Sequence, residues 1–526
     1  MPFPSLFHPV SAAALLLIAP AVAFADVPDG DLPPPQTTAV PVPAGQIEAA
    51  IEQLDERAEA LMERSGIPGI AVAVVHEGQT VYAAGFGLRK VGEEATVDPD
   101  TVFQLASLSK SISATVVAQQ VAEGVVGWDT PIIEFLPDFK LADPWVTEHV
   151  TVGDLFSHRS GLPDHAGDDL EDLGYTREEV LSRLHLLPLS PFRDTYAYTN
   201  FGLTAAAEAV AAAADLDWES LAEDALYEPL GMSSTSSRFA DYAARENRAH
   251  GHVRVGDDFE ALYVRQPDAQ SPAGGVSASV NDMARWMALL LQDGRFEEQQ
   301  ILPPGALLEP MTAKMISSPS FAPDARPGFY GYGIGVGIEA SGRVSLSHSG
   351  AFALGAGTNY TLLPSLDLGI VILTNADPTG VGEALAMEFS ELVQYGGISR
   401  DWYAAYQPLI GPITAPIGEL VGKERPSAAA EPAPLAHYAG IYDNPYFGTA
   451  VISNGSEGLR LTIGPAHLNY RLSHWDGDSF TYRPFGENAP AGSISEVTFE
   501  RDGEKAAAMT IEFLNEQGLG RFQRQD

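Results

Sequence analysis

The sequence predicts two folded domains of different class, a large α/β (α+β) domain followed by a small all-β domain. Helical and strand patterns mix between residues 45 and 410, whereas residues 435–526 contain only short alternating runs separated by turns. Between them, residues 411–434 are rich in Pro and Ala, which indicates an inter-domain linker. The chain has 526 residues, of which 45% are hydrophobic, enough for more than one core.

The large domain is expected to begin with a helix and an antiparallel hairpin. Apolar residues recur at helical spacing from Gln46 to a stop at Gly66. Residues 70–87 then show the pattern of two strands joined at a turn, His76-Glu77-Gly78. A helix followed at once by a hairpin is typical of a domain that layers helices on a sheet.

Further along, the pattern is helical first and then returns to strands. Helices are predicted over 107–124, 201–216 and 281–294, the first ending at Gly124 and the third capped by Asn281. Strands are predicted over 330–338, 343–350 and 368–376. After residue 435 the short runs recur evenly, which predicts a small barrel or sandwich.

Composition excludes several classes of function. Lys and Arg number 30 against 70 Asp and Glu, a formal net charge of −40 that repels phosphate backbones and anionic membranes. The chain has no cysteine, so thiol nucleophiles, disulfides and cysteine–zinc sites are excluded. No apolar run beyond the N-terminus is long enough for a membrane span. We expect no nucleic-acid partner and no cofactor.

The N-terminus predicts export. Residues 11–25 form an apolar run that ends in the small-x-small sequence Ala23-Phe24-Ala25, typical of a cleaved signal peptide over residues 1–25. A proline-rich linker is expected over 26–44. The protein would then be periplasmic or secreted. Because no Lys or Arg precedes the apolar run, an uncleaved hydrophobic tail is the alternative.

Ser107 and Lys110 are the candidate nucleophile and base. Both lie at the start of a predicted helix, where residues three apart share a face with Cβ atoms about 5–6 Å apart. Serine attacks a carbonyl only when a base takes its proton, and a lysine with a lowered pKa can do so. Taken alone, the S-x-x-K spacing is common by chance and fits an N-cap serine beside a solvated lysine.

Two later elements supply what such a site needs. Tyr198-Thr199-Asn200 precedes the alanine-rich helix, and its phenol can relay protons while the amide of Asn200 binds a carbonyl or the lysine. His348-Ser349-Gly350 lies at a predicted strand end, where glycine lets a substrate approach the strand edge. The N–H of Ala351 can then join that of Ser107 as an oxyanion donor.

These three elements, in this order, resemble the S-x-x-K, Y-x-N and K-T-G or H-x-G motifs of the serine β-lactamase-like superfamily. Secondary phrases at 155–165, 228–235 and 271–286 are similar to family sequence, and the resemblance covers about residues 45–400. It includes class C β-lactamases, D-alanyl-D-alanine carboxypeptidases, D-aminopeptidases and esterases. Residues 435–526 resemble the lipocalin-like β domain appended to some of these hydrolases.

The resemblance implies a transpeptidase fold, with a helical domain beside an antiparallel sheet flanked by helices and the site between them. Ser107 would form an acyl-enzyme, with Lys110 and Tyr198 as the base system. Asn200, His348, Ser349 and Gly350 would bind substrate, and the N–H groups of Ser107 and Ala351 would bind the oxyanion. The C-terminal domain could cap the cleft or form a homo-oligomer.

His348 stands where typical β-lactamases carry lysine, and loss of that fixed cation weakens binding of a β-lactam carboxylate. We therefore expect a serine hydrolase that acts on small or linear peptides, with weak β-lactamase activity. A carboxylesterase of the same family is one alternative, and a non-hydrolytic protein that binds peptidoglycan peptides is another. An intact Ser-Lys-Tyr set disfavours a pure binder.

Several other signals are assigned structural roles. Gly331, Gly333, Gly335 and Gly337 indicate a glycine-lined strand, because a nucleotide loop needs a strand-turn-helix context. His250 and His252 lack a third metal ligand nearby, and no metal site is predicted. His158 and His165 are interpreted as structural. The acidic run Asp168, Asp169, Glu171 and Asp172 is interpreted as a solvated face.

Overall fold

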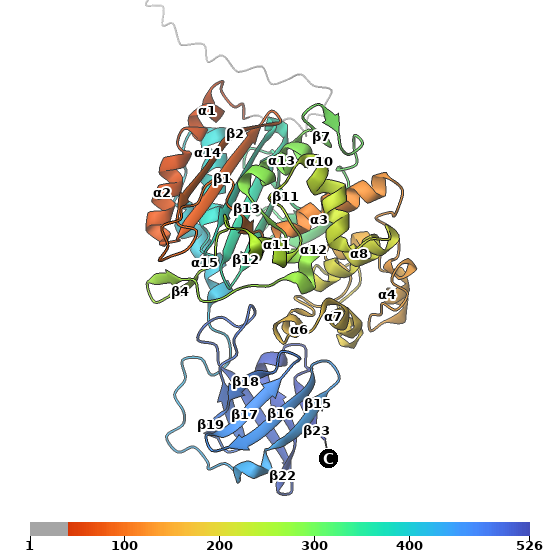
Figure 1. Ribbon diagram of the computed structural model, residues 1–526, viewed down its shortest axis with the longest axis vertical. Coiled ribbons are helices and arrows are strands. Elements are labelled where there is room, and N and C mark those ends of the chain that lie inside the picture. The colour runs from red at the N-terminus through yellow and green to blue at the C-terminus, as the bar shows by residue number, and fades with distance from the viewer. Residues whose placement is uncertain (1–39, 526) are drawn as a thin grey trace, which may run out of the picture.

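The computed structural model describes residues 40–525 and places two bodies along its long axis (Figure 1). The signal peptide expected at 1–25 and most of the linker expected at 26–44 lie outside the described residues. The large domain combines helices with an eight-stranded sheet, and the C-terminal residues form a nearly closed nine-stranded antiparallel barrel. The predicted α/β domain with a small all-β barrel is therefore confirmed.

The main sheet is antiparallel throughout and has the order β2-β1-β14-β13-β12-β11-β10-β9. The hairpin predicted at 70–87 is its first edge, and the strands predicted at 343–350 and 368–376 lie in its interior. The strands are β1 (Gly69–His76), β2 (Gln79–Gly87), β9 (Met315–Ser318), β10 (Gly328–Tyr330), β11 (Gly335–Ile338), β12 (Val344–Phe352), β13 (Ala356–Leu363) and β14 (Leu368–Thr374).

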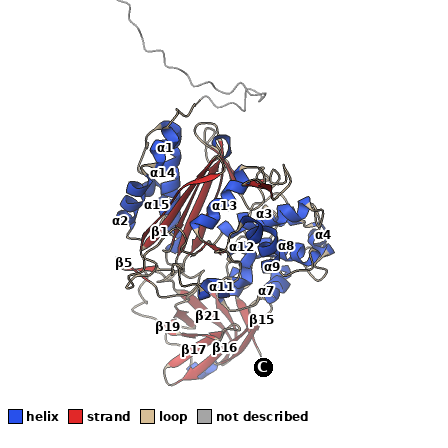
Figure 2. Ribbon diagram, turned by 45° about the horizontal axis from the view of Figure 1, so that its top comes forward, coloured by secondary structure: helices blue, strands red, loops and turns tan. Residues whose placement is uncertain are grey.

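Helices cover both faces of this sheet, so its central strands are buried on both sides (Figure 2). Along β1, Ile70, Val72 and Val74 face one core, whereas Ala71 and Ala73 face the other. The first core is formed with α1 (Gln46–Ile51), α2 (Leu54–Ser65) and α14 (Val381–Tyr395), and the second with α13 (Val280–Leu291) and the helical lobe. Helix α15 (Trp402–Thr414) packs on α14.

The helical lobe lies beside the sheet and packs around two buried helices, α3 (Leu108–Ala122) and α8 (Asn200–Ala213). Alanines on α8 allow its neighbours to approach closely, which explains the alanine-rich pattern. The remaining helices are α4 (Pro144–His149), α5 (Val152–Phe156), α6 (Asp168–Asp172), α7 (Arg177–Arg183), α9 (Trp218–Ala222), α10 (Glu228–Leu230), α11 (Phe239–Ala244) and α12 (Ser271–Gly274). Three small two-stranded sheets pair β3 (Phe103–Gln104) with β6 (Ser277–Ala278), β4 (Val253–Val255) with β5 (Asp258–Glu260), and β7 (Arg295–Phe296) with β8 (Gln299–Gln300).

In the barrel, the last strand lies in the middle of the sheet, whose order is β18-β17-β16-β15-β23-β22-β21-β20-β19. Alternate residues point inward, as in Leu459, Leu461 and Ile463. The strands are β15 (Gly440–Asn444), β16 (Gly448–Gly455), β17 (Gly458–Ile463), β18 (Leu468–Arg471), β19 (Ser473–Asp476), β20 (Ser479–Tyr482), β21 (Ser495–Asp502), β22 (Lys505–Ile511) and β23 (Arg521–Arg524).

Several local expectations are corrected. Helix α13 is capped by the side chain of Ser279, which accepts from the Asp282 N–H, and Asn281 lies inside the helix. The strand predicted to end at Gly350 continues to Phe352, so His348-Ser349-Gly350 lies within β12. Only Gly335 and Gly337 of the glycine series lie in a strand. Within residues 40–525, no helix is both long and apolar enough to cross a membrane.

Candidate active site

Ser107 is held at the N-terminus of α3 by an unusual backbone. The residue before it, Ala106, is fully buried and has φ of 48°, a left-handed conformation that alanine rarely adopts. Strand β12 passes so close that a Cβ on Gly350 would overlap the Leu105 carbonyl oxygen and lie 3.0 Å from the Ser107 nitrogen. Only glycine at position 350 lets the strand approach the nucleophile this closely.

Lys110 lies directly under Ser107, as the helical spacing predicts. Its Nζ donates to Ser107 Oγ at 3.1 Å, to Asn200 Oδ1 at 2.7 Å and to the Ala273 carbonyl at 2.9 Å. The side chain is fully buried and has no carboxylate among these partners. Burial lowers the pKa of Lys110 to about 7, although the charge of Asp168 opposes this shift. A substantial fraction of the amine is therefore neutral near pH 7 and able to accept a proton.

Tyr198 precedes α8 and Asn200 is its first residue, and both lie beside Lys110. The N–H of Thr199 donates to His158 Nδ1 at 3.2 Å, and the N–H of Tyr198 donates to the Asp164 carboxylate at 2.7 Å. The Lys110 ammonium lies 4.6 Å from the centre of the Tyr198 ring. Burial raises the pKa of the Tyr198 phenol, and a hydrogen bond with Ser107 opposes the rise. The structural interpretation of His158 is consistent with these contacts.

The acidic run of α6 is not a solvated face, which corrects the expectation from sequence. Asp168 is buried, and its Oδ2 accepts from Asn200 Nδ2 at 2.8 Å and from His165 Nδ1 at 2.8 Å. Glu171 pairs with Arg265 at 2.6 Å. Helix α6 is covered because the C-terminal barrel packs on it, a contact between distant parts of the chain that local composition does not reveal.

His348 is held as a neutral imidazole. Its Nδ1 lies 2.7 Å from the Ser349 carbonyl, and its Nε2 lies 2.7 Å from the Tyr330 hydroxyl. Because a carbonyl only accepts, these partners assign the hydrogen to Nδ1, and Nε2 accepts from Tyr330. Burial, helped by the nearby Lys110 charge, lowers the pKa of His348 to about 3. The ring therefore supplies no fixed positive charge to the site.

Strand β12 presents an open backbone edge beside the nucleophile. The ladder between β11 and β12 runs from Ile338–Val344 only as far as Gly335–Ser347. On the other side, β13 pairs with β12 through Phe352. Residues 348–352 thus keep one edge that no described strand covers, next to Ser107. This is where the N–H of Ala351 was expected to join that of Ser107.

A cavity of about 660 Å³ opens over these groups. One side, which we call the catalytic wall, consists of Ser107, Tyr198, Asn200 and residues 349–351. His348 and Lys110 lie behind this wall and do not line the cavity within the described part of the chain. The volume is ample for a peptide of a few residues.

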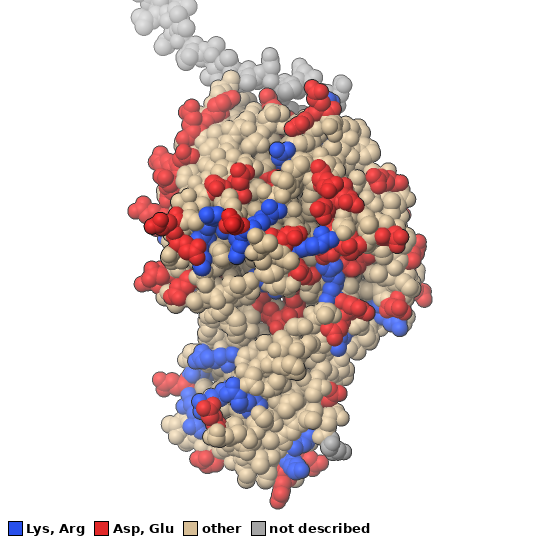
Figure 3. All heavy atoms as spheres, in the orientation of Figure 1, with Lys and Arg blue, Asp and Glu red and all other residues tan. Residues whose placement is uncertain are grey.

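Another part of the cavity lining is formed by α6 and by loops of the barrel, including Phe447, Glu487 and Glu516. The barrel is fixed there by hydrogen bonds across the junction. Asp172 accepts from the N–H groups of Glu487 at 3.2 Å and Asn488 at 2.9 Å, and Glu487 accepts from the N–H of Ala353 at 2.6 Å. Figure 3 shows acidic side chains gathered where the two bodies meet.

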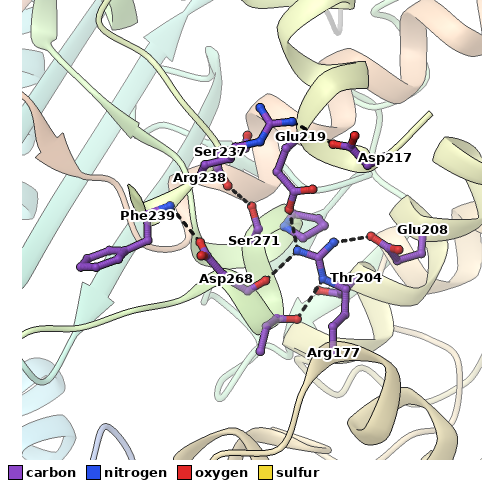
Figure 4. Close-up of polar contacts among 12 residues, drawn as sticks. Arg177, Thr204, Glu208, Asp217, Glu219, Ser237, Arg238, Phe239, Asp268 and Ser271 are labelled. Atoms are coloured by element: carbon purple, nitrogen blue, oxygen red, sulfur yellow. Dashed lines mark hydrogen bonds and ion pairs between the residues drawn. The ribbon is translucent and has the colours of Figure 1, made fainter. Parts of the chain in front are cut away.

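A charged network in the helical lobe anchors the turn that leads into α12. Figure 4 shows Arg177 of α7 between Glu208, at 2.5 Å, and Glu219, at 2.6 Å. The same guanidinium donates to the Asp268 carbonyl at 2.6 Å, just before α12. Helix α12 carries Ala273, whose carbonyl accepts from the Lys110 ammonium, so Arg177 bonds the segment next to this part of the site.

The structure brings together all the site residues predicted from sequence and adds several that sequence reasoning missed. Asp168, Ala273 and Tyr330 support Asn200, Lys110 and His348, and Glu487 reaches the cavity from the barrel. Ala273 lies in a phrase already similar to family sequence, but its role belongs to a backbone carbonyl. His252 is buried and bonded to Val91 N and the Asn375 carbonyl, as expected of a structural histidine.

Each of the two domains matches a protein-family model. Residues 54–392 match the family model described as Beta-lactamase, which is more than half of the chain. Residues 424–523 match a second model, described as Domain of unknown function (DUF3471). The two matches correspond to the large domain and the barrel.

Among curated proteins, the chain is 26% identical to Unguisins hydrolase ungD of Aspergillus violaceofuscus over 458 residues, 79% of this chain and 80% of that protein. It is 31% identical to Penicillin-binding protein 4 of Amycolatopsis lactamdurans, over 45% of this chain and 63% of that one. It is also 24% identical to the D-alanyl-D-alanine-carboxypeptidase/endopeptidase AmpH of Escherichia coli, over 48% of this chain and 66% of that one.

Two solved structures share the fold. The octameric penicillin-binding protein homologue from Pyrococcus abyssi superposes with a TM-score of 0.58 and 19% identity, covering 90% of this chain and 99% of that one. A class C beta lactamase from Rhodobacter sphaeroides gives 0.52 and 21% identity, covering 66% of this chain and 98% of that one.

Proposed function

The chain belongs to the beta-lactamase family of serine hydrolases, and we propose that it cleaves amide bonds of small or linear peptides through an acyl-enzyme on Ser107. One observation carries the proposal: a fully buried lysine, free of any carboxylate partner, lies 3.1 Å from the Ser107 hydroxyl. That pair is a nucleophile with its base already in place.

The geometry supports a two-step reaction. Ser107 Oγ attacks the substrate carbonyl as its proton passes to neutral Lys110, either directly or by relay through the Tyr198 phenol, which gives up its own proton to Lys110 as it accepts the proton from Ser107. The N–H groups of Ser107 and Ala351 stabilise the oxyanion, and the proton then passes to the leaving amine. Water attacks the acyl-enzyme in the second step, with Tyr198 and Lys110 again as the base, and releases the acid.

The neutral state of His348 favours peptides over β-lactams. A β-lactam carboxylate needs a fixed cation, and both nitrogens of His348 are already bonded to Tyr330 and Ser349. A relative is named as a carboxypeptidase/endopeptidase, and another as a hydrolase of unguisins. Ester cleavage would use the same acyl-enzyme and is the nearest alternative, since an ester only has a better leaving group.

The test is a labelling and activity experiment. The pure protein is treated with a fluorophosphonate and the adduct is mapped, while Ser107→Ala is assayed on aminoacyl amides, linear peptides, short-chain p-nitrophenyl esters and a chromogenic cephalosporin. We expect the label on Ser107, faster turnover of amides than of the cephalosporin, and no turnover by Ser107→Ala. A label on another residue, or full activity in Ser107→Ala, would contradict the proposal.

Two further points complete the proposal. We infer export to the periplasm or medium from the apolar run that ends at Ala25, and sequencing the N-terminus of the mature protein tests it. We also infer that the barrel can support a homo-oligomer, since a homologue of the same fold is octameric. Light scattering of the purified protein gives its mass in solution.

A further inference from the structure

The cavity is strongly asymmetric in charge. Five carboxylates from α6 and the barrel line the cavity, and we call them the acidic wall: Asp168, Asp169 and Glu171 of α6, with Glu487 and Glu516 of the barrel. Asp164 and Glu383 line the same cavity. Within residues 40–525, Arg265 is the only Lys or Arg that lines it.

The cationic groups of the cavity are already paired. His165 also lines it, and the hydrogen bond with Asp168 raises the pKa of His165 to about 9, so this second cation is held by Asp168. Arg265 Nη2 lies 2.6 Å from Glu171 Oε2, and its Nε lies 3.8 Å from Glu487 Oε2. Its side chain is only 8% exposed, so it cannot swing out to serve other groups. The acidic wall therefore keeps more negative than positive charge after its internal pairs are counted.

Two oxygens of the wall have no donor. Asp168 Oδ1 and Glu171 Oε1 are buried and accept no hydrogen bond from any described residue, and both side chains are 6% exposed. Buried acceptors are normally satisfied, so these two oxygens leave the hydrogen-bonding capacity of the wall unfilled by described residues. The second oxygen of each carboxylate is occupied, by Asn200 and His165 for Asp168 and by Arg265 for Glu171.

The charges of the wall also oppose one another. Burial, with the charges of Asp172 and Asp168, raises the pKa of Asp169 to about 7, and Glu516 of the barrel adds to the effect. Burial likewise raises the pKa of Glu487 to about 7. A cation placed among these groups would relieve both the repulsion and the unmet acceptors.

We propose that the substrate carries a protonated amine, which binds the acidic wall while the scissile carbonyl lies at Ser107. This inference rests on the proposed hydrolase function and specifies the substrate class. An ammonium group offers three N–H donors to the carboxylates of the acidic wall, and its charge matches their excess. The amine can be the α-amino group of the substrate or a lysine-like side chain, since both offer the same chemistry.

Matched substrates test the inference. We compare kcat/KM for an alanyl p-nitroanilide and its N-acetyl derivative, and for Nα-acetyl-lysyl p-nitroanilide and its Nε-acetyl derivative, in D and L forms. Wild type should prefer the free amine in at least one pair by about tenfold, an effect typical of one charge pair in a partly solvated site. The arm that shows the preference identifies the position of the amine.

Two isosteric variants remove charge from opposite sides of the junction, Asp169→Asn on α6 and Glu516→Gln on the barrel. Each should lower the preference for the amine over its acetylated partner, and added salt should lower it further. Glu298→Gln is the control, because Glu298 is exposed on the large domain and does not line the cavity. It should leave the preference at the wild-type value.

Two failures are distinguishable. If wild type hydrolyses both members of each pair equally, with Ser107→Ala inactive, the enzyme is a serine hydrolase and the amine inference is wrong. If wild type prefers the amine but Asp169→Asn and Glu516→Gln keep the full preference, the acidic wall does not bind it. Activity that survives in Ser107→Ala would instead overturn the proposed function itself.

Discussion

The two sides of the cavity are built on opposite principles. At the catalytic wall, polar groups are paired: Lys110, directly behind the wall, has three acceptors, and Asn200 bonds both Lys110 and Asp168. On the acidic wall, carboxylates outnumber cations and two buried oxygens lack a donor. Groups whose hydrogen bonds are already made by neighbouring residues are held in place for acyl transfer. Carboxylates that lack a partner are instead available to bind a cationic ligand.

The two walls also come from different parts of the sequence. The catalytic wall comes entirely from the large domain, while the acidic wall needs both α6 and barrel loops. We infer that changes in the first wall alter rate and that changes in the second alter selectivity or the docking of the barrel. Four experiments test this division between the two walls.

The strongest test concerns the base. Lys110→Met should lower kcat/KM by about 10³-fold, because general base catalysis by Lys110 is lost. In wild type, neutral Lys110 is required, so activity should rise with pH through about 7 and fall about tenfold per unit below it. The pH profile of a neutral ester measures this.

Lys140→Met is the control for that variant, because Lys140 is exposed and remote from the cavity. It should keep the wild-type profile. An acid optimum in wild type, or an unchanged profile in Lys110→Met, would contradict a lysine base.

Gly350→Ala should damage the catalytic wall through its backbone. The new Cβ would overlap the Leu105 carbonyl and press on the Ser107 nitrogen, so the strand or the nucleophile must shift. A misplacement near 1 Å costs about 100-fold in kcat. Gly397→Ala serves as control, since nothing lies within 4 Å of its added Cβ. Equal kcat in both variants would show that the close approach is unimportant.

Arg177→Met tests the support behind the catalytic wall. Loss of the guanidinium leaves Glu208 and Glu219 unpaired at 28% and 15% side-chain exposure, and we expect about 2 kcal/mol lower stability. Urea unfolding measures it. Arg238→Met removes more exposed pairs and should cost about 0.5 kcal/mol. Similar losses in both would mean that the Arg177 network contributes no more than a surface pair.

Asp172→Ala tests how the barrel is held. It removes the acceptor of the Glu487 and Asn488 N–H groups, so two donors at the junction lose their partner. We expect about 1–2 kcal/mol lower stability, with the amine preference reduced and the neutral-ester rate less affected. Differential scanning calorimetry gives the stability. Glu457→Ala, an exposed change on the barrel, should do neither. A large loss of ester turnover in Asp172→Ala would contradict the inference that the acidic wall sets selectivity and not rate.

Local spacing made the catalytic wall predictable. Ser107 and Lys110 are three residues apart at the start of one helix, so their side chains lie on the same face of that helix. Tyr198 and Asn200 lie just before and at the start of another helix, two residues apart, so they are expected to lie close together. Pattern and turn residues likewise locate the hairpin 69–87 and the barrel strands. Asn281 was mistaken for a cap because Ser279, two residues earlier, is equally suited.

Tertiary contacts explain what the sequence could not predict. The charged residues of α6 are typical of a solvated helix, but distant segments cover them. Asn200 and Arg265 of the large domain bond Asp168 and Glu171, and Glu487 of the barrel, 315 residues after Asp172, bonds Asp172. Tyr330 reaches His348 from a different strand, so no local pattern links the two. Ala273 acts through its carbonyl, which every residue possesses and no sequence motif encodes.

The central place of β23 in the barrel bears on how the protein is made. Residues 521–524 pair with both β15 and β22, so they join the two halves of the barrel sheet. During synthesis the catalytic wall can fold while the ribosome is still translating the barrel, but these four residues must emerge before the barrel closes. The nascent protein would thus hold its nucleophile before Glu487 and Glu516 complete the acidic wall, and it would be reactive earlier than it is selective.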